Sequence, residues 1–128
     1  MTPEEFVNAL RHAAIEPAID GTLEALQDPP GRRPRRALVE MSAWYARVSE
    51  TDRSRLRELA SMVAHEAVFG VLAVLDGARF IESTPEKGVF RLTFSKGGSQ
   101  WELTSETGMA LHDFLAEPEE DPEKPCVH

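Results

Sequence analysis

The sequence predicts an α+β fold in which N-terminal helices and a long central buried helix pack against a three-stranded antiparallel β-meander and a short C-terminal helix. Apolar residues recur at helical spacing over residues 3–75, and they alternate with polar residues over 79–104. A length of 128 residues with 41% hydrophobic composition suits one folded core. We therefore expect a single domain over residues 1–116 and an acidic, proline-rich disordered tail over 117–128.

The first helix is predicted to begin at Thr2, which can cap it, with Pro3 in the first turn and Glu5 completing a capping box. Pro17 is expected to end this helix, because proline lacks the N–H that a helix interior requires. A further short helical turn is expected after it. Asp28–Gly31, with the sequence Asp-Pro-Pro-Gly, should then break the chain.

Two more helices are predicted to meet at a sharp corner with almost no loop. The first begins near Arg36 or Ala37 and runs to Val48. Ser49 caps the second, which stops at Gly77 after roughly 27 residues, about 40 Å. Its second half has no polar stripe, so we expect it to be buried on all sides. Its apolar run is shorter than the ~18 residues of a membrane span and contains two polar residues, so a core helix is the interpretation.

The expected meander lies after this helix. Its first strand covers Arg79–Glu82 and its second Phe90–Phe94, with a proline-containing turn between them. A glycine-rich turn at Lys96–Ser99 leads to the third strand, Gln100–Thr104. The long helix is the expected cover for the apolar face of this sheet. A last short helix over Met109–Leu115 precedes the tail.

Charge is unevenly distributed along the chain. Of a net charge of −8, residues 1–60 contribute ten acids against nine arginines, and residues 61–128 contribute twelve acids against five basic residues. An acidic protein repels nucleic acid and membrane surfaces and suits a basic partner. The single cysteine, Cys126, excludes an intrachain disulfide framework and a cysteine-based zinc site. The first residues lack a signal-peptide layout, so we expect a cytoplasmic protein without a cofactor.

Two histidine–acid pairs are the polar candidates if the protein is an enzyme. His65 and Glu66 lie within the sequence HEAVF, which lacks the second histidine of the H-E-x-x-H zinc motif. His112 and Asp113 are adjacent on the last helix and should point in different directions, which argues against an acid–base pair. Asp76 with its following glycine is interpreted as helix termination. No catalytic residue and no metal site are therefore predicted.

The densest cluster of like charge consists of four loop arginines, Arg32, Arg33, Arg35 and Arg36. They can contact phosphate, nucleic acid or an acidic partner, or they can form a solvated loop that pairs with acids of the second half. The acidic whole and the absence of interleaved aromatics disfavour nucleic acid. Trp44 and Tyr45 are expected in the core, although either ring would be a natural interface anchor if it were exposed.

The run SAWYARVSETDRSRLRELASMVAHEAVFGVLAVLDG, followed by FIE, PEKGVFRLTF and LHDFL, resembles a group of small uncharacterised bacterial proteins. Members share a WY…S..DR…E…FG.L.VLDG…I pattern, a short β-meander and an LHDLF-type ending. The matching residues are Trp44, Tyr45, Ser49, Asp52, Arg53, Glu66, Phe69, Gly70, Leu72, Val74 to Gly77, Ile81, Leu111, His112, Asp113, Phe114 and Leu115. The resemblance covers about residues 42–115, reverses the last two residues of the ending, and implies a bacterial source and the α+β order but no activity.

The small acidic chain without a catalytic motif favours a protein that acts by binding another protein. One form is an immunity or antitoxin-like inhibitor that occupies a basic toxin domain, since charge asymmetry can steer such an association. One alternative is a homo-oligomeric structural domain, a homodimer included. The other is a small enzyme or ligand-binding module that uses the four polar candidates, His65, Glu66, His112 and Asp113.

Overall fold

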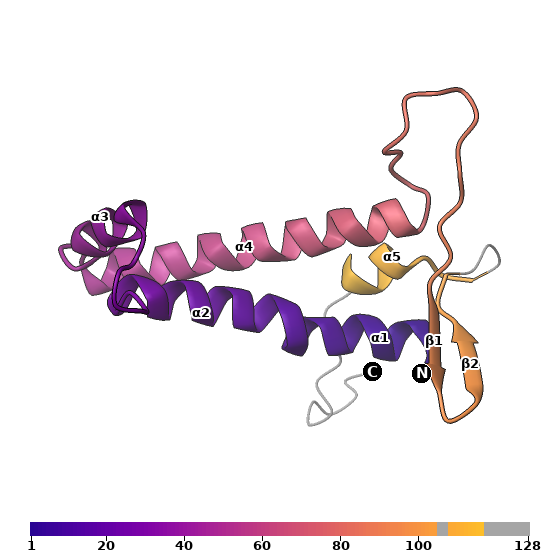
Figure 1. The fold of residues 1–128 in the computed structure, drawn as a ribbon, viewed down its shortest axis with the longest axis horizontal. Helices are drawn as coiled ribbons and strands as arrows, with labels where there is room; N and C mark the ends of the chain where they lie inside the picture. Colours follow the sequence, from indigo (N-terminus) through magenta and orange to yellow (C-terminus); the bar gives the residue numbers. More distant parts are fainter. Residues whose placement is uncertain (105–107, 117–128) are drawn as a thin grey trace, which may run out of the picture. The chain divides into compact units, whose positions relative to one another are not determined.

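The computed structural model describes residues 1–104 and 108–116 (Figure 1). The chain divides into two compact units: a terminal unit of Met1–Leu10 with Phe69–His128, and a middle unit of Arg11–Val68. The elements in chain order are α1 (Pro3–Leu10), the π-helical turn η1 (Arg11–Ile15), α2 (Glu16–Gln27), α3 (Arg36–Tyr45), α4 (Glu50–Leu75), β1 (Thr93–Lys96), β2 (Ser99–Glu102) and α5 (Leu111–Ala116). The expected tail over 117–128 lies outside the described residues.

The prediction of a three-stranded meander is wrong. Within the described part of the chain, the sheet is a two-stranded antiparallel hairpin of β1 and β2, and the fold is mostly helical. The expected first strand, Arg79–Glu82, belongs instead to a long loop between α4 and β1 (Figure 1). Polar–apolar alternation indicates that a segment suits a β-strand. It does not indicate that another strand lies beside it to complete the sheet. Local bonds organise the loop: Lys87 Nζ donates to the Glu82 carbonyl at 2.6 Å, and the Gly88 N–H donates to the Glu82 carboxylate at 2.7 Å.

The hairpin turn itself is confirmed. Gly97 and Gly98 have φ angles of 57° and 80°, which a two-residue type I′ turn requires at both positions. The register places Phe94 opposite Trp101, and their ring centroids are 5.6 Å apart. Such cross-strand aromatic pairs stabilise a hairpin that would otherwise be marginal in water.

The N-terminal capping box is confirmed, but the helix does not stop at Pro17. Thr2 Oγ1 accepts from the Glu5 N–H at 3.1 Å, and the Glu5 carboxylate accepts from the Thr2 N–H at 3.0 Å. Helical structure then continues through η1 into α2, where Pro17 occupies the first turn. A proline in a first turn removes an N–H that has no helical partner there, and the π-helical turn before it changes the register of the bonds.

The core of the middle unit lies between α2 and α3, which pack against each other. Ile15, Ile19 and Leu23 recur on one face of the helical segment and are buried, as is Tyr45 at the end of α3. Ser42 Oγ also donates to the carbonyl of Leu26, 2.6 Å away. Polar and apolar residues share the solvent side.

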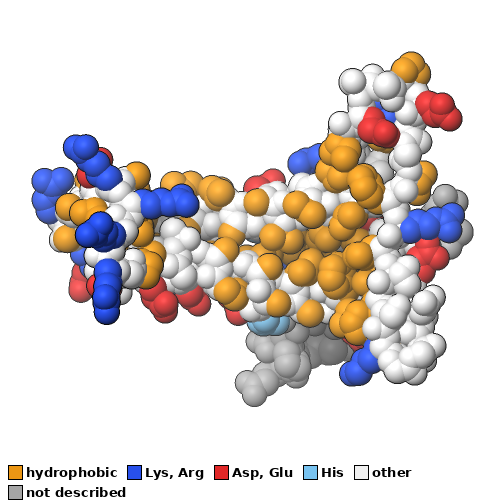
Figure 2. Space-filling view, viewed as in Figure 1, with side chains coloured by type: hydrophobic (Ala, Val, Ile, Leu, Met, Phe, Trp, Pro, Cys, Tyr) orange, Lys and Arg blue, Asp and Glu red, His pale blue; other side chains and the backbone are white. Residues whose placement is uncertain are grey.

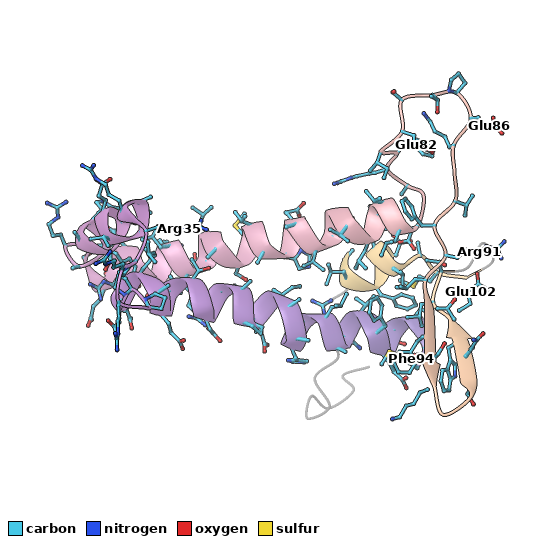
Figure 3. All side chains as sticks on the ribbon, viewed as in Figure 1. Arg35, Glu82, Glu86, Arg91, Phe94 and Glu102 are labelled. Atoms are coloured by element: carbon cyan, nitrogen blue, oxygen red, sulfur yellow. The ribbon has the colours of Figure 1, made fainter. Side chains whose placement is uncertain are left out.

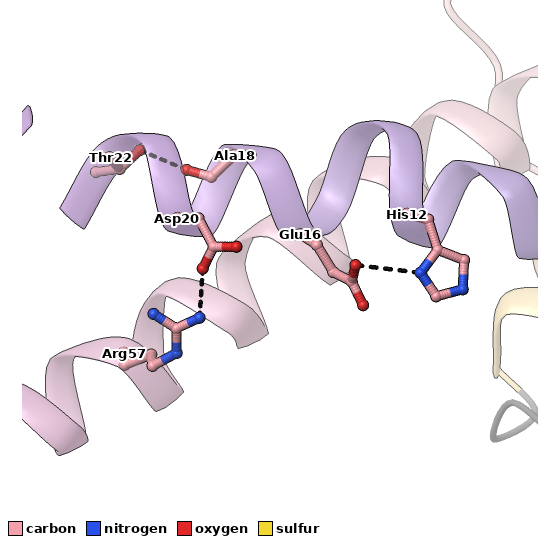
Figure 4. A network of polar contacts seen from close by, with 6 residues as sticks. All are labelled: His12, Glu16, Ala18, Asp20, Thr22 and Arg57. Atoms are coloured by element: carbon pink, nitrogen blue, oxygen red, sulfur yellow. Dashed lines mark hydrogen bonds and ion pairs between the residues drawn. The ribbon is translucent and has the colours of Figure 1, made fainter. Parts of the chain in front are cut away.

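Figure 4 shows the polar network on that solvent side. Arg57 of α4 pairs with Asp20 of α2, and His12 Nδ1 lies 3.1 Å from the Glu16 carboxylate. These side chains are about half exposed, so each pair contributes little to stability by itself. The Arg57–Asp20 pair nevertheless joins α4 to α2 within the middle unit.

Both predicted ends of the long helix are confirmed. The Asp52 N–H donates to Ser49 Oγ at 3.2 Å, which makes Ser49 the N-cap of α4. At the other end Gly77 has φ 79°, its N–H donates to the Val74 carbonyl at 3.1 Å, and the Ala78 N–H donates to the carbonyl of Ala73 at 2.9 Å. This pair of bonds is a Schellman motif, which satisfies carbonyls that the helix end leaves open.

The expectation that the long helix is buried on all sides is wrong. In α4 the buried residues are Leu72 and Ala73, whereas Leu59, Met62 and Val63 are each more than half exposed. An apolar helix is buried all round only where other elements cover every face, and composition cannot show that they do. By length and composition alone, α4 could also cross a membrane: an 18-residue window has mean hydropathy 1.6 and is 11% buried. Core helices of soluble proteins pass the same test, so the match is weak.

The core of the terminal unit is formed by α1, α5 and the last turns of α4. Val7, Leu72, Leu111 and Leu115 are its most deeply buried large side chains, and α5 packs beside α1 (Figure 1). Leu111 and Leu115 are four residues apart on α5, which is the helical spacing that the sequence indicated. The expected last helix is thus present, from Leu111 to Ala116.

Candidate functional site

The terminal unit brings Asp76 and His112 together across 36 residues of sequence. The Schellman turn holds Asp76 just after α4, and His112 lies in the first turn of α5. Asp76 Oδ2 accepts from the His112 N–H at 2.8 Å and contacts His112 Nδ1 at 2.7 Å. The Asp76 side chain is 6% exposed and that of His112 19%. Because an ionised carboxylate only accepts hydrogen bonds, the contact assigns the proton to Nδ1.

The His112 ring is held from its other sides as well. Phe69 meets it edge-on, with ring centroids 5.4 Å apart and planes at 84°, and Asp113 Oδ1 lies 3.4 Å from His112 Nε2. The Arg79 guanidinium in turn lies over the Phe69 ring, 5.8 Å from its centroid. The ring is therefore fixed by a carboxylate, an aromatic edge and its own helix.

An Asp–His pair can orient a histidine for catalysis, but it then needs a reacting group. Among residues 1–104 and 108–116, no hydroxyl or thiol contacts His112, and no group of three His, Cys, Asp or Glu could hold a metal ion. The arrangement does have a structural purpose, because Ala110 precedes α5 and cannot cap it with a side chain. Asp76 supplies that cap from the end of α4.

A cavity of about 560 Å³ lies next to Asp76, between the end of α4, the 77–92 loop and β2. Its lining combines apolar side chains such as Phe80 and Phe90 with charges of both signs. Figure 3 shows Arg91, in the chain entering β1, and Glu102, at the end of β2, among these charges. The mixed lining selects no single ligand chemistry.

In the middle unit, the residues between α3 and α4 form a tightly held corner. Arg53 NH2 donates to the Tyr45 carbonyl at 3.0 Å, and its guanidinium lies over the Tyr45 ring, 4.5 Å from the centroid. Ser49 caps α4 between them. The WY…S..DR pattern therefore has a structural explanation: these residues shape the turn and the start of the helix.

Trp44 is the exception within that pattern. Its residue is 43% exposed, whereas Tyr45 beside it is 4% exposed. Trp44 borders a hollow of about 610 Å³, whose lining we call the α3–α4 corner. The corner consists of Trp44, Arg47, Val48, Ser49, Asp52, Arg55, Leu56 and Leu59. It combines apolar side chains with charged ones.

The arginine loop precedes α3 in the same unit. All four of its arginines are exposed, and Arg36 pairs with Glu40 one turn along α3 at 3.0 Å. Figure 2 shows blue side chains gathered over α3 and this loop, and Figure 3 labels Arg35 at the start of α3. The loop thus adds positive charge at the N-terminal end of the helix that carries Trp44.

The other polar candidates are distributed over the two units. His65 is half-buried and Glu66 exposed, both on the part of α4 that belongs to the middle unit, whereas Asp113 is exposed in the terminal unit. Sequence reasoning missed Asp76 as the partner of His112, because it interpreted that residue only as part of a helix end. The VLDG and LHD stretches were both visible, but no local signal connects them.

Comparison of the chain with protein-family models, curated proteins and solved structures gave no match.

Proposed function

We propose that this chain acts by binding another protein, and that the α3–α4 corner is the contact surface. Exposed Trp44 carries the proposal: a large aromatic ring stands 43% exposed at the edge of a hollow with a mixed apolar and charged lining, next to a buried tyrosine. Tryptophan is enriched among the residues that dominate binding energy, because it buries a large area with few rotatable bonds. The corner offers such an anchor together with a space for a partner side chain.

The surface next to the corner supports the same proposal. Leu59 borders the hollow, and Met62 and Val63 follow one turn later, all more than half exposed. Single exposed apolar residues are ordinary, whereas a contiguous group on a soluble domain marks an interaction site. Figure 2 shows orange side chains along α4 in this region.

An immunity or antitoxin-like role is the second form of the proposal, and charge supports it. Residues 11–68 carry nine acids and nine arginines, so the whole net charge of −8 belongs to the remaining residues. The negative charge of these remaining residues can steer a basic toxin domain toward the chain. In this form the corner supplies the short-range contacts after encounter.

Binding to the products of adjacent genes tests the proposal. Each neighbour would be purified and titrated against the chain by calorimetry, and we expect one to bind. Trp44→Ala should then weaken binding about 30-fold, the effect of losing ~2 kcal/mol at a hot spot. Trp101→Ala is the matched control, because Trp101 is similarly exposed but lies on β2 in the other unit.

Two results would overturn the proposal. Either no neighbour binds, or a neighbour binds the Trp44→Ala variant as tightly as the wild type. The immunity form has its own readout: co-expression of the chain should restore growth to cells that express the toxic neighbour.

A further inference from the structure

The outer face of α3 carries an apolar stripe that continues into the corner. Leu38, Ser42 and Tyr45 form the inner face, where Tyr45 is buried and Ser42 bonds to α2. Ala37, Met41 and Trp44 are exposed on the adjacent, solvent-facing side, about 100° around the helix, spaced four and three residues apart, and Val48 follows at the hollow. This is the spacing of one face of an α-helix, so α3 presents a second helix-packing surface to solvent.

Arginines stand at both ends of this stripe, and Asp52 lies with Arg47 in the lining of the hollow at the far end. Arg32, Arg33 and Arg35 precede α3, and Arg47 follows it beside the hollow. These four side chains are exposed, and within the described ranges none makes an ion pair with an acid. Arg36 differs, since Glu40 on α3 pairs with it. An apolar stripe with unpaired cations at each end complements an apolar stripe with acids at each end.

We propose that the partner segment is an acidic amphipathic helix of another protein, lying along the outer face of α3 with an apolar side chain in the hollow beside Trp44. This inference rests on the proposed function, protein binding at the α3–α4 corner, and names the chemistry of the partner segment that meets α3. A partner that is basic overall, as in the immunity form, would carry this acidic helix as a local segment. The stripe from Ala37 to Val48 spans 12 residues of sequence, so a helix of roughly three turns, about 16 Å, covers it. Acids at its two ends meet Arg35 at the start of α3 and Arg47 after its end.

The charge pattern argues against a second copy of this chain as the occupant. Pairing α3 with itself antiparallel places the arginine loop of one copy beside Arg47 of the other. Pairing it parallel places the two arginine loops side by side. Either orientation brings arginines of the two copies together. Glu40, the acid of α3, is already paired with Arg36, which leaves Asp52 beside Arg47 as the one acid of the corner to face them.

The chain's own acidic tail also lacks the required chemistry. Residues 117–128 contain Pro118, Pro122 and Pro125, so no run of more than three residues is free of proline. Proline is disfavoured inside a helix, so this sequence does not have the pattern of an amphipathic helix. It also lacks the repeated large apolar residues that would face the α3 stripe.

Three labelled peptides test the inference by fluorescence anisotropy with the full chain. The first is an amphipathic helix of about 18 residues with leucines on one face and glutamates elsewhere, long enough to be helical. The second replaces every glutamate by lysine, and the third has the sequence of residues 117–128. We expect the acidic helix to bind at least tenfold more tightly than the basic helix, on the order of 1.4 kcal/mol. This difference in affinity should become smaller as salt is added, because salt screens the charges. The tail peptide should not bind.

Variants separate this inference from the proposed function. The double variant Arg35→Glu with Arg47→Glu should reverse the preference between the two helices, while Arg91→Glu in the other unit should leave it unchanged. If the basic helix binds as well as the acidic one and Trp44→Ala still abolishes binding, the contact surface is confirmed. The inference that the partner helix is acidic is then wrong. If the chain sediments as a dimer that Trp44→Ala disperses, a second copy is the occupant and the inference is also wrong. Binding that Trp44→Ala leaves intact contradicts the proposed function itself.

Discussion

Trp44 and Tyr45 are neighbours in sequence with opposite surroundings. The Tyr45 ring lies under the Arg53 guanidinium and faces the core of the middle unit, while the Trp44 ring faces solvent at the corner. The sequence predicted both rings in the core, which is confirmed for Tyr45 and wrong for Trp44. The exposure of Trp44 is harder to predict, because Met41 and Trp44 form a second apolar stripe that a larger fold could have covered.

Leu72 is the residue on which a stability prediction is best based. It is 1% exposed, so Leu72→Ala should lower the free energy of unfolding by about 2–5 kcal/mol through lost burial and the cavity it leaves. Leu59 is 55% exposed on the same helix, so Leu59→Ala should lower the free energy of unfolding by much less than Leu72→Ala does. Urea unfolding followed by circular dichroism measures both. Equal losses for the two variants would mean that α4 is covered differently from the structure described above.

At the scale of elements, the sequence predicts best what is decided within a few residues. Thr2, Ser49 and Gly77 set helix ends through bonds to near neighbours, and the two glycines of the hairpin turn do the same. Contacts between segments that are distant in sequence depend on how the whole chain folds. The Asp76–His112 contact depends on how the chain returns after 36 residues, and the 79–82 segment lacks a strand partner although its own pattern suits one. Neither outcome leaves a local signature.

Asp76 provides a test of how α5 is held in the terminal unit. Asp76→Ala removes the acceptor of both the His112 N–H and Nδ1, so it should lower the free energy of unfolding by about 1–3 kcal/mol. Asp113→Ala is the control, because that side chain is 53% exposed and should change stability by less than about 0.5 kcal/mol. Asp76→Asn should fall between them, since the amide oxygen can still accept from the N–H. A stable Asp76→Ala protein whose α5 amides keep their hydrogen-exchange protection would contradict the anchoring role.

At the scale of the whole molecule, exposed apolar side chains occur in both units, on α3, α4 and the 77–92 loop. Two kinds of surroundings could cover such residues: partner proteins or a lipid bilayer. Charge along α4 disfavours the bilayer. Six of residues 50–58 are charged, and the remaining 17 residues of the helix would span about 25 Å, short of the ~30 Å hydrocarbon core. Glu66 lies near the middle of that stretch, where an ionised acid costs roughly 2.5–3.5 kcal/mol.

We therefore expect the chain to stay in the supernatant after high-speed centrifugation and to remain at the bottom of a gradient in which lipid vesicles float. Glu66→Leu is the informative companion variant, because it removes the central charge and should increase vesicle association if any part of α4 can enter a bilayer. A wild-type chain that floats with vesicles and is released only by detergent would show that α4 spans a membrane. The Leu59, Met62 and Val63 surface would then face lipid, and the protein-binding proposal would have to rest on Trp44 and the outer face of α3 alone.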